Sequence, residues 1–82
     1  MQEIRNIHIL VEGRVQGVGF RYFVKDVAAG LHITGWVRNR FDDRVEILAQ
    51  GSAVDLARFI AAVRVGPSSA LVTGVVTDSP PV

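Results

Sequence analysis

The segment from Gly13 to Arg21 constrains the fold of this chain more than any other stretch. It holds three glycines within seven residues, Gly13, Gly17 and Gly19, between an alternating run and the start of a helical repeat. Glycine adopts positive φ without a steric penalty, so the backbone there can curl and turn several N–H groups inward. Such a concave row of amides, with the N-terminus of a helix directly behind it, binds an anion.

Arg21 is expected in the first turn of that helix. Its guanidinium is a planar, permanently charged fork that fits a phosphoryl group. The segment taken alone is equally compatible with a steric role for the glycines and a solvated arginine. We interpret it as a candidate phosphate-binding loop.

Composition limits the remaining possibilities. The 82 residues are 49% hydrophobic, which is enough for the core of one small domain. The absence of cysteine excludes disulfides, a cysteine–zinc site and a thiolate nucleophile, and His8 and His32 lack metal-ligand spacing. We therefore expect no metal site built on cysteine or histidine. The polar N-terminus and the lack of a long apolar run predict a cytoplasmic protein without a membrane segment.

The charges are nearly balanced but unevenly distributed. Nine basic and eight acidic residues give a net charge of +1, which argues against a general nucleic-acid-binding surface. Five of the nine basic residues fall in two short stretches and predict one local positive site: Arg14, Arg21, Arg38, Arg40 and Arg44.

The first half of the chain contains one strand pattern and one helix pattern. Residues 4–12 alternate between apolar and polar side chains, the period of a half-buried strand, with His8 on the polar side. After the glycine-rich segment, apolar residues recur every three or four positions, and Gly30 is placed to end the helix. The members of this apolar stripe are Phe20, Phe23, Val24, Val27, Ala28 and Leu31.

The second half repeats the plan. Residues 33–39 and 44–50 read as two strands joined by a short turn, hence an antiparallel hairpin. Ser52 is a suitable helix N-cap, with Asp55 three residues later, and the buried stripe of the helix consists of Leu56, Phe59, Ile60 and Val63. A β-branched strand follows at 70–77.

The resulting order is β-α-β-β-α-β. It predicts an α+β fold of the ferredoxin-like, split β-α-β type, with two helices on one face of a four-stranded antiparallel sheet. We expect a single domain over residues 1–78 and a C-terminal tail over 79–82. The second strand is expected at a sheet edge. Because the first two strands run parallel, Asn39 should end beside the glycine-rich loop, on the helix-covered face with Arg21.

Two motifs resemble those of the acylphosphatases. Gly13-Arg14-Val15-Gln16-Gly17-Val18-Gly19-Phe20-Arg21 is similar to the first signature of that family, and Gly35-Trp36-Val37-Arg38-Asn39 is similar to the second. The resemblance covers about residues 5 to 78 and implies metal- and cofactor-independent hydrolysis of the carboxyl–phosphate bond of a small acyl phosphate, with a monomer as the enzyme.

The resemblance also assigns roles. Arg21 would bind the phosphate, and Asn39 would orient the attacking water. The amides of the phosphate-binding loop would come from Val15, Gln16, Gly17, Val18, Gly19 and Phe20. An acyl phosphate expels a carboxylate, so no general acid is required, and the absence of histidine and cysteine from both motifs favours water attack over a phospho-enzyme.

The chain departs from the family pattern in two places. Asp42-Asp43 stands where members usually carry Asp-Gly, so the hairpin turn is expected to differ in type or to be strained. The usual fifth strand near the C-terminus is missing. We therefore expect the second strand either to be covered by the tail over residues 79–82, in a contact outside the sheet ladder, or to exchange its amide hydrogens faster than the first and third strands.

Three other functions are compatible with parts of this pattern. A phosphate- or carboxylate-binding regulatory module would carry the same loop but would not need Asn39. An RNA-recognition domain shares the β-α order, but its stacking aromatics are missing from residues 4–12 and 44–50. The chain also resembles an acylphosphatase-like domain of a larger carbamoyl-transferring maturation enzyme, although a sequence that starts at Met1 favours the small enzyme.

Overall fold

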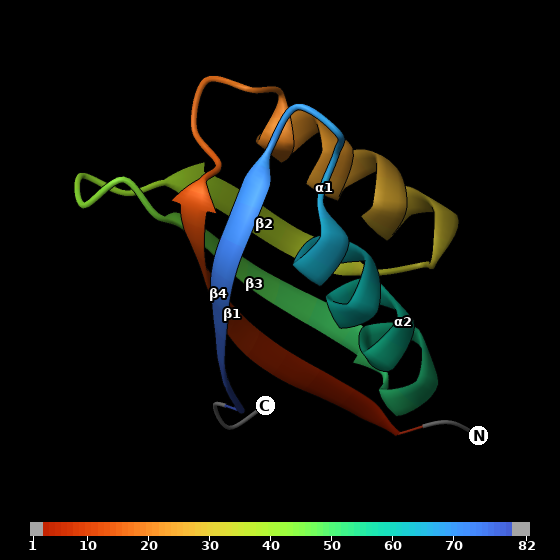
Figure 1. Ribbon diagram of the computed structural model, residues 1–82. Helices are drawn as coiled ribbons and strands as arrows, with labels where there is room; N and C mark the ends of the chain where they lie inside the picture. Colours follow the sequence, from red (N-terminus) through yellow and green to blue (C-terminus); the bar gives the residue numbers. More distant parts are fainter. Residues whose placement is uncertain (1–2, 80–82) are drawn as a thin grey trace.

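Six elements follow one another in the predicted order β-α-β-β-α-β (Figure 1). The computed structural model describes residues 3–79. The elements are β1 (Ile4–Arg14), α1 (Phe20–Gly30), β2 (Thr34–Asn39), β3 (Val45–Ser52), α2 (Ala53–Val65) and β4 (Leu71–Asp78).

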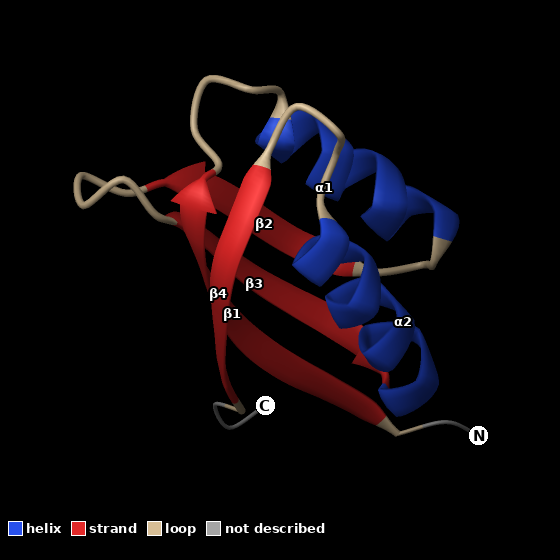
Figure 2. Cartoon of the chain, viewed as in Figure 1, coloured by secondary structure: helices blue, strands red, loops and turns tan. Residues whose placement is uncertain are grey.

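The four strands form one sheet in the order β2-β3-β1-β4. Each neighbouring pair is antiparallel, and both helices cover the same face (Figure 2). The predicted ferredoxin-like arrangement is confirmed, with β2 at one edge. Because β1 and β2 are each antiparallel to β3, they run parallel to each other and end on the same side of the sheet.

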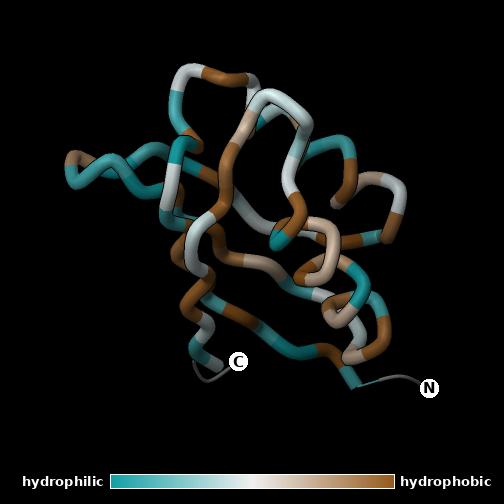
Figure 3. The backbone as a smooth tube through the Cα atoms, viewed as in Figure 1, coloured by the Kyte–Doolittle hydropathy of each residue, from teal (hydrophilic) through white to brown (hydrophobic). Residues whose placement is uncertain are grey.

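The core lies between the sheet and the helices. Alternate residues of β1 and β3 point toward the helices, and the alternation of apolar and polar residues along the strands is visible in Figure 3. Burying each large side chain stabilises the fold by about 1.5–3 kcal/mol. The largest fully buried side chains are Phe20, Phe59, Ile9, Ile47, Leu56, Val11, Val15, Val45 and Val63.

β1 extends further than the sequence pattern predicted. A register shift between Glu12 and Gly13 allows the strand to keep pairing with β4 as far as Arg14. Gly13 has φ 124°, and a Cβ at this position would lie 2.0 Å from the carbonyl oxygen of Leu71. Gly13 therefore serves strand pairing at a bulge and does not belong to the anion-binding turn, which corrects the grouping of the three glycines.

The C-terminal end of the domain also differs slightly from expectation. Asp78 belongs to β4, where it pairs with His8, although the sequence pattern ended the strand at Thr77. Of the predicted tail 79–82, only Ser79 lies within the described residues, and 80–82 lie outside them. The division into a 1–78 domain and a tail stays a prediction.

The turn between β2 and β3 is tied down by its own side chains. The amide of Arg40 donates to the carbonyl of Arg44 at 2.8 Å, and the Asp42 carboxylate accepts from the amide and guanidinium of Arg44. Asp43, which replaces the glycine usual in similar turns, has φ 68°. A side chain in this left-handed conformation is strained, as the sequence led us to expect.

Replacing Asp43 with glycine should stabilise the protein. The left-handed backbone would lose its Cβ strain, for an expected gain of about 0.5–1 kcal/mol. Thermal unfolding should report a Tm higher by roughly 2–6 °C. Asp43→Ala is the matched control, because it removes the same carboxylate but keeps the Cβ. An equal increase in Tm for both variants would show that removal of the carboxylate charge stabilises the protein. It would contradict the proposed backbone strain at Asp43.

The edge position of β2 predicts uneven hydrogen exchange. β2 has one neighbouring strand within the described part of the chain, so some of its backbone N–H groups face away from the sheet. The amides of residues 35–37 should exchange faster than those of residues 7–11, because β1 pairs on both sides. Native-state exchange followed by NMR measures both sets, and equal protection in a monomer would contradict an uncovered edge.

Candidate active site

The loop between β1 and α1 has the backbone of an anion-binding turn. Gly17 and Gly19 have φ 72° and 76°, and Val18 between them is not among the residues with positive φ. A tight turn in which residues of positive and negative φ alternate favours a concave arrangement of successive N–H groups. Gly19 is also the N-cap of α1, which has no side-chain cap and no acidic residue in its first turn. The N–H groups at this helix end therefore have no side-chain acceptor competing with an anion.

The structure brings the two predicted motifs together around one cavity. The cavity has a volume of about 180 Å³. It is lined by Val15, Gly17, Gly19, Phe20, Arg21, Tyr22 and Asn39. The loop, the first turn of α1 and the last residue of β2 therefore meet at one end of the sheet, as the topology predicted (Figure 1).

Packing and strand register explain the places of the two candidate side chains. Phe20, the first helical residue, is 1% exposed and anchors the helix in the core, which leaves the next residue, Arg21, at the surface. Asn39 lies opposite Val45 in the β2–β3 register. Since Val45 is buried beneath the helices, the side chain of Asn39 belongs to the helix-covered face, as predicted.

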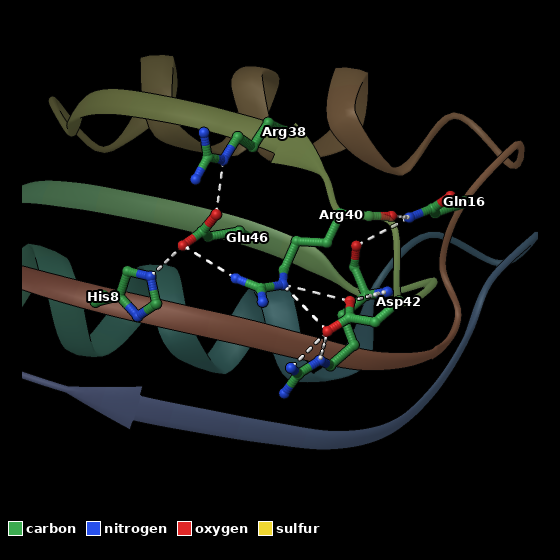
Figure 4. Close-up of polar contacts among 7 residues, drawn as sticks. His8, Gln16, Arg38, Arg40, Asp42 and Glu46 are labelled. Atoms are coloured by element: carbon green, nitrogen blue, oxygen red, sulfur yellow. Dashed lines mark hydrogen bonds and ion pairs between the residues drawn. The ribbon is translucent and has the colours of Figure 1, made fainter.

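Gln16 and Val18, two of the predicted loop residues, do not line the cavity. The Gln16 side chain instead donates from Nε2 to the carbonyl oxygens of Arg40 and Arg44, both at 2.9 Å (Figure 4). The carbonyl of Val18 accepts from Ser69 Oγ at 2.7 Å. Sequence reasoning missed both attachments. They fasten the loop to the β2–β3 turn and to the connection before β4.

Three of the five arginines expected to form one positive site are paired with carboxylates. Asp42 binds Arg44 Nη2 at 2.6 Å and Arg40 Nε at 3.2 Å, and Glu46 pairs with Arg38. Hydrogen bonding to Arg44 lowers the pKa of Asp42 to about 2 and in turn raises the pKa of Arg44. Within residues 3–79 no ion pair joins Arg21 to a carboxylate. Arg21 therefore lines the cavity with a positive charge that no carboxylate of the described residues neutralises.

Glu46 is the centre of a second polar cluster, on the sheet face away from the helices. His8 Nε2 donates to Glu46 Oε2 at 2.6 Å, and Arg38 Nε donates to Oε1 at 2.6 Å (Figure 4). These hydrogen bonds, that from His8 first, hold the pKa of Glu46 below its usual value despite its burial. The prediction that His8 lies on the polar face is correct, but its partner 38 residues away has no signal in the local sequence.

Within residues 3–79 no group of three or more His, Cys, Asp or Glu side chains is arranged to hold a metal ion. In the same part of the chain, neither helix has the length and apolar character that crossing a membrane requires.

Fold and site together define a ferredoxin-like α+β domain whose first strand-to-helix loop carries two positive-φ glycines beside an uncapped helix N-terminus. A sequence model of the acylphosphatase family matches residues 7–81. An acylphosphatase of Bacillus subtilis is 53% identical over 72 residues, which cover 87% of this chain and 79% of that protein. The chain belongs to the acylphosphatase family. The resemblance identified from the two motifs is thus confirmed.

Solved structures agree with this assignment. The crystal structure of acylphosphatase from Bacillus subtilis superposes with a TM-score of 0.90 at 45% identity, over 95% of this chain and 86% of that one. Full-length HypF, in a phosphate- and nucleotide-bound form, matches with a TM-score of 0.93 at 29% identity. This second match covers 100% of the present chain but 11% of HypF, so the same fold also occurs as a small part of a much longer protein.

Proposed function

We propose that this acylphosphatase cleaves the carboxyl–phosphate bond by direct attack of one water molecule, which Asn39 orients while Arg21 and the loop hold the phosphoryl group. Hydrolysis of acyl phosphates as the reaction class follows from membership of the family. The observation that carries the proposed mechanism is the single cavity lined by the glycine loop, Arg21 and Asn39.

The phosphoryl group would lie in the loop. The phosphoryl oxygens would accept hydrogen bonds from backbone amides of residues 15–20 and from the Arg21 guanidinium. The N-terminus of α1, which has no side-chain cap, would add partial positive charge. During transfer, charge is spread over the three equatorial phosphoryl oxygens, and preorganised donors stabilise it without reorganisation. Binding and transition-state stabilisation therefore use the same groups.

The attacking water would be held by the side-chain amide of Asn39. An amide both donates and accepts hydrogen bonds but does not take up a proton, so Asn39 acts by orientation and not as a base. The leaving carboxylate is a stable anion and needs no protonation. We propose that the proton of the water passes to the phosphoryl oxygens themselves, so that one water molecule and the acyl phosphate become a carboxylate and inorganic phosphate.

Three properties of the proposed enzyme come from the sequence alone. We propose that it works as a monomer in the cytoplasm, with no nucleic-acid partner. The regulatory-module alternative differs from the enzyme in one measurable respect, because such a module would bind phosphate without turnover.

Purified protein should hydrolyse a simple aryl acyl phosphate, and the rate should be unchanged by an excess of EDTA. The expected result rests on the loop, Arg21 and Asn39 supplying all the stabilisation that the reaction needs. Release of inorganic phosphate is measured with and without chelator. Loss of activity that divalent ions restore would contradict the metal-free mechanism. Phosphate binding without any turnover would favour the regulatory module.

Substitutions should separate the roles of the two side chains. Arg21→Ala should raise the inhibition constant of inorganic phosphate, which means weaker binding, and should nearly abolish turnover. The reason is that it removes the cation aimed at the phosphoryl oxygens. Asn39→Ala should leave that constant largely intact and lower kcat by about 100- to 1,000-fold, as the loss of one preorganised hydrogen-bonding group does.

The chain offers a matched control for each variant. Arg58→Ala removes an exposed arginine of α2, and Asn6→Ala removes the only other asparagine, near the start of β1. Both should retain full activity. An equal loss of phosphate affinity in Arg21→Ala and Asn39→Ala would refute the division of roles.

A further inference from the structure

Glu46 is a buried charge that the proposed reaction does not use. It is 6% exposed, yet it lies on the sheet face that the helices do not cover. Its carboxylate is shielded by three cationic or hydrogen-bonding neighbours. One is His8 on β1. The second is Arg38 on β2, which lies directly opposite Glu46. The third is Arg40, whose Nη1 pairs with Oε2 of Glu46 at 3.5 Å. A buried carboxylate is costly unless such partners compensate it.

The two arginines that Glu46 holds are the immediate neighbours of Asn39 in the chain. Successive side chains of a strand point to opposite faces, so Arg38 and Arg40 reach Glu46 on one face while Asn39 belongs to the other. The Glu46 carboxylate on β3 therefore forms ion pairs with both chain neighbours of Asn39. Figure 4 shows both arginine side chains turned toward Glu46.

Further contacts restrain the end of β2 and the residue that follows it. The strand is at the edge of the sheet and pairs with β3 alone among the described strands. Arg38 also lies 5.0 Å from the ring centre of Trp36, which limits its freedom to leave Glu46. Arg40 is also held by the Asp42 carboxylate, by the bond from its amide to the Arg44 carbonyl and, through its own carbonyl, by Gln16 of the loop. The end of β2 is thus fixed between Glu46 and the phosphate-binding loop.

We infer that Glu46 is a positioning residue for catalysis: through Arg38 and Arg40 it holds the end of β2 so that the Asn39 amide stays at the cavity. The inference rests on the proposed role of Asn39. Glu46 is not among the residues that line the cavity with Arg21, so we expect it to act on the reaction only through Asn39. Loss of its charge should therefore affect the orientation of the water and leave phosphate binding unchanged.

The test is Glu46→Gln, which keeps the size of the side chain and removes its charge. We expect kcat to fall by about 10- to 100-fold, the cost of a misplaced reacting group. KM and the inhibition constant of inorganic phosphate should stay within about twofold, because the loop keeps its own contacts. An unchanged kcat, or a parallel loss of phosphate affinity, would overturn the inference.

His8→Leu is the matched control. It removes the partner of Glu46 on β1 but leaves Arg38 and Arg40, so it should lower Tm without lowering kcat at a temperature well below unfolding. Equal losses of kcat in His8→Leu and Glu46→Gln would show that the cluster acts only through stability. Should Glu46→Gln fail to fold, Arg38→Met makes the same test, because the Arg38 side chain is 65% exposed.

A double-mutant cycle separates this inference from the proposed function. If Glu46 acts through Asn39, then Glu46→Gln should have no further effect on kcat in an Asn39→Ala background. Independent, multiplying losses would overturn the positioning role. If Asn39→Ala alone left kcat unchanged, the proposed catalytic role of Asn39 would be refuted, and the positioning role of Glu46 with it. A loss in Asn39→Ala combined with normal activity in Glu46→Gln would refute the positioning role alone.

Discussion

Val45, near the start of β3, pairs with Val11 of β1 on one side and with Asn39 of β2 on the other. This single row across the sheet fixes how far β2 extends relative to the end of β1, where the loop begins. A slip of one residue in the β2–β3 register would turn Asn39 to the opposite face and expose the apolar side chains of β2. The burial of Val45 and Ile47 beneath the helices opposes such a slip. Core packing and the geometry of the site therefore depend on the same register.

The two faces of the sheet carry different kinds of contact. The helix-covered face supplies the core and ends at the cavity, with Phe20 as the last buried residue before Arg21. The other face carries the ionic contacts of Glu46. The loop joins the two, since Gln16 donates to backbone carbonyls on either side of the β2–β3 turn. An edge strand with one neighbour among the described strands is thus held by attachments from both faces and from the loop.

Much of the fold was predictable because its signals are local. Alternation in β1 and β3 and the three- and four-residue spacing in α1 each arise within one element, and all six elements were predicted within a few residues of their observed bounds. The errors have physical causes. Gly13 was grouped with the loop because a bulge needs glycine for the same reason a turn does, and only the close approach of the Leu71 carbonyl distinguishes the two. The five arginines were predicted as one positive site because the sequence does not reveal that Asp42 and Glu46 neutralise three of them.

By itself, the sequence determined the order of the elements, the glycine loop followed by Arg21, the position of Asn39 at a strand end, and the family. These follow from short stretches in which residue type and spacing carry the whole signal. Tertiary structure alone decided which side chains meet: Gln16 with the carbonyls of the β2–β3 turn, and Glu46 with His8 on one strand and with the arginines on either side of Asn39. The reason is that the partners lie on different strands, and only the pairing register, which is set by burial of the whole core, brings them within hydrogen-bonding distance.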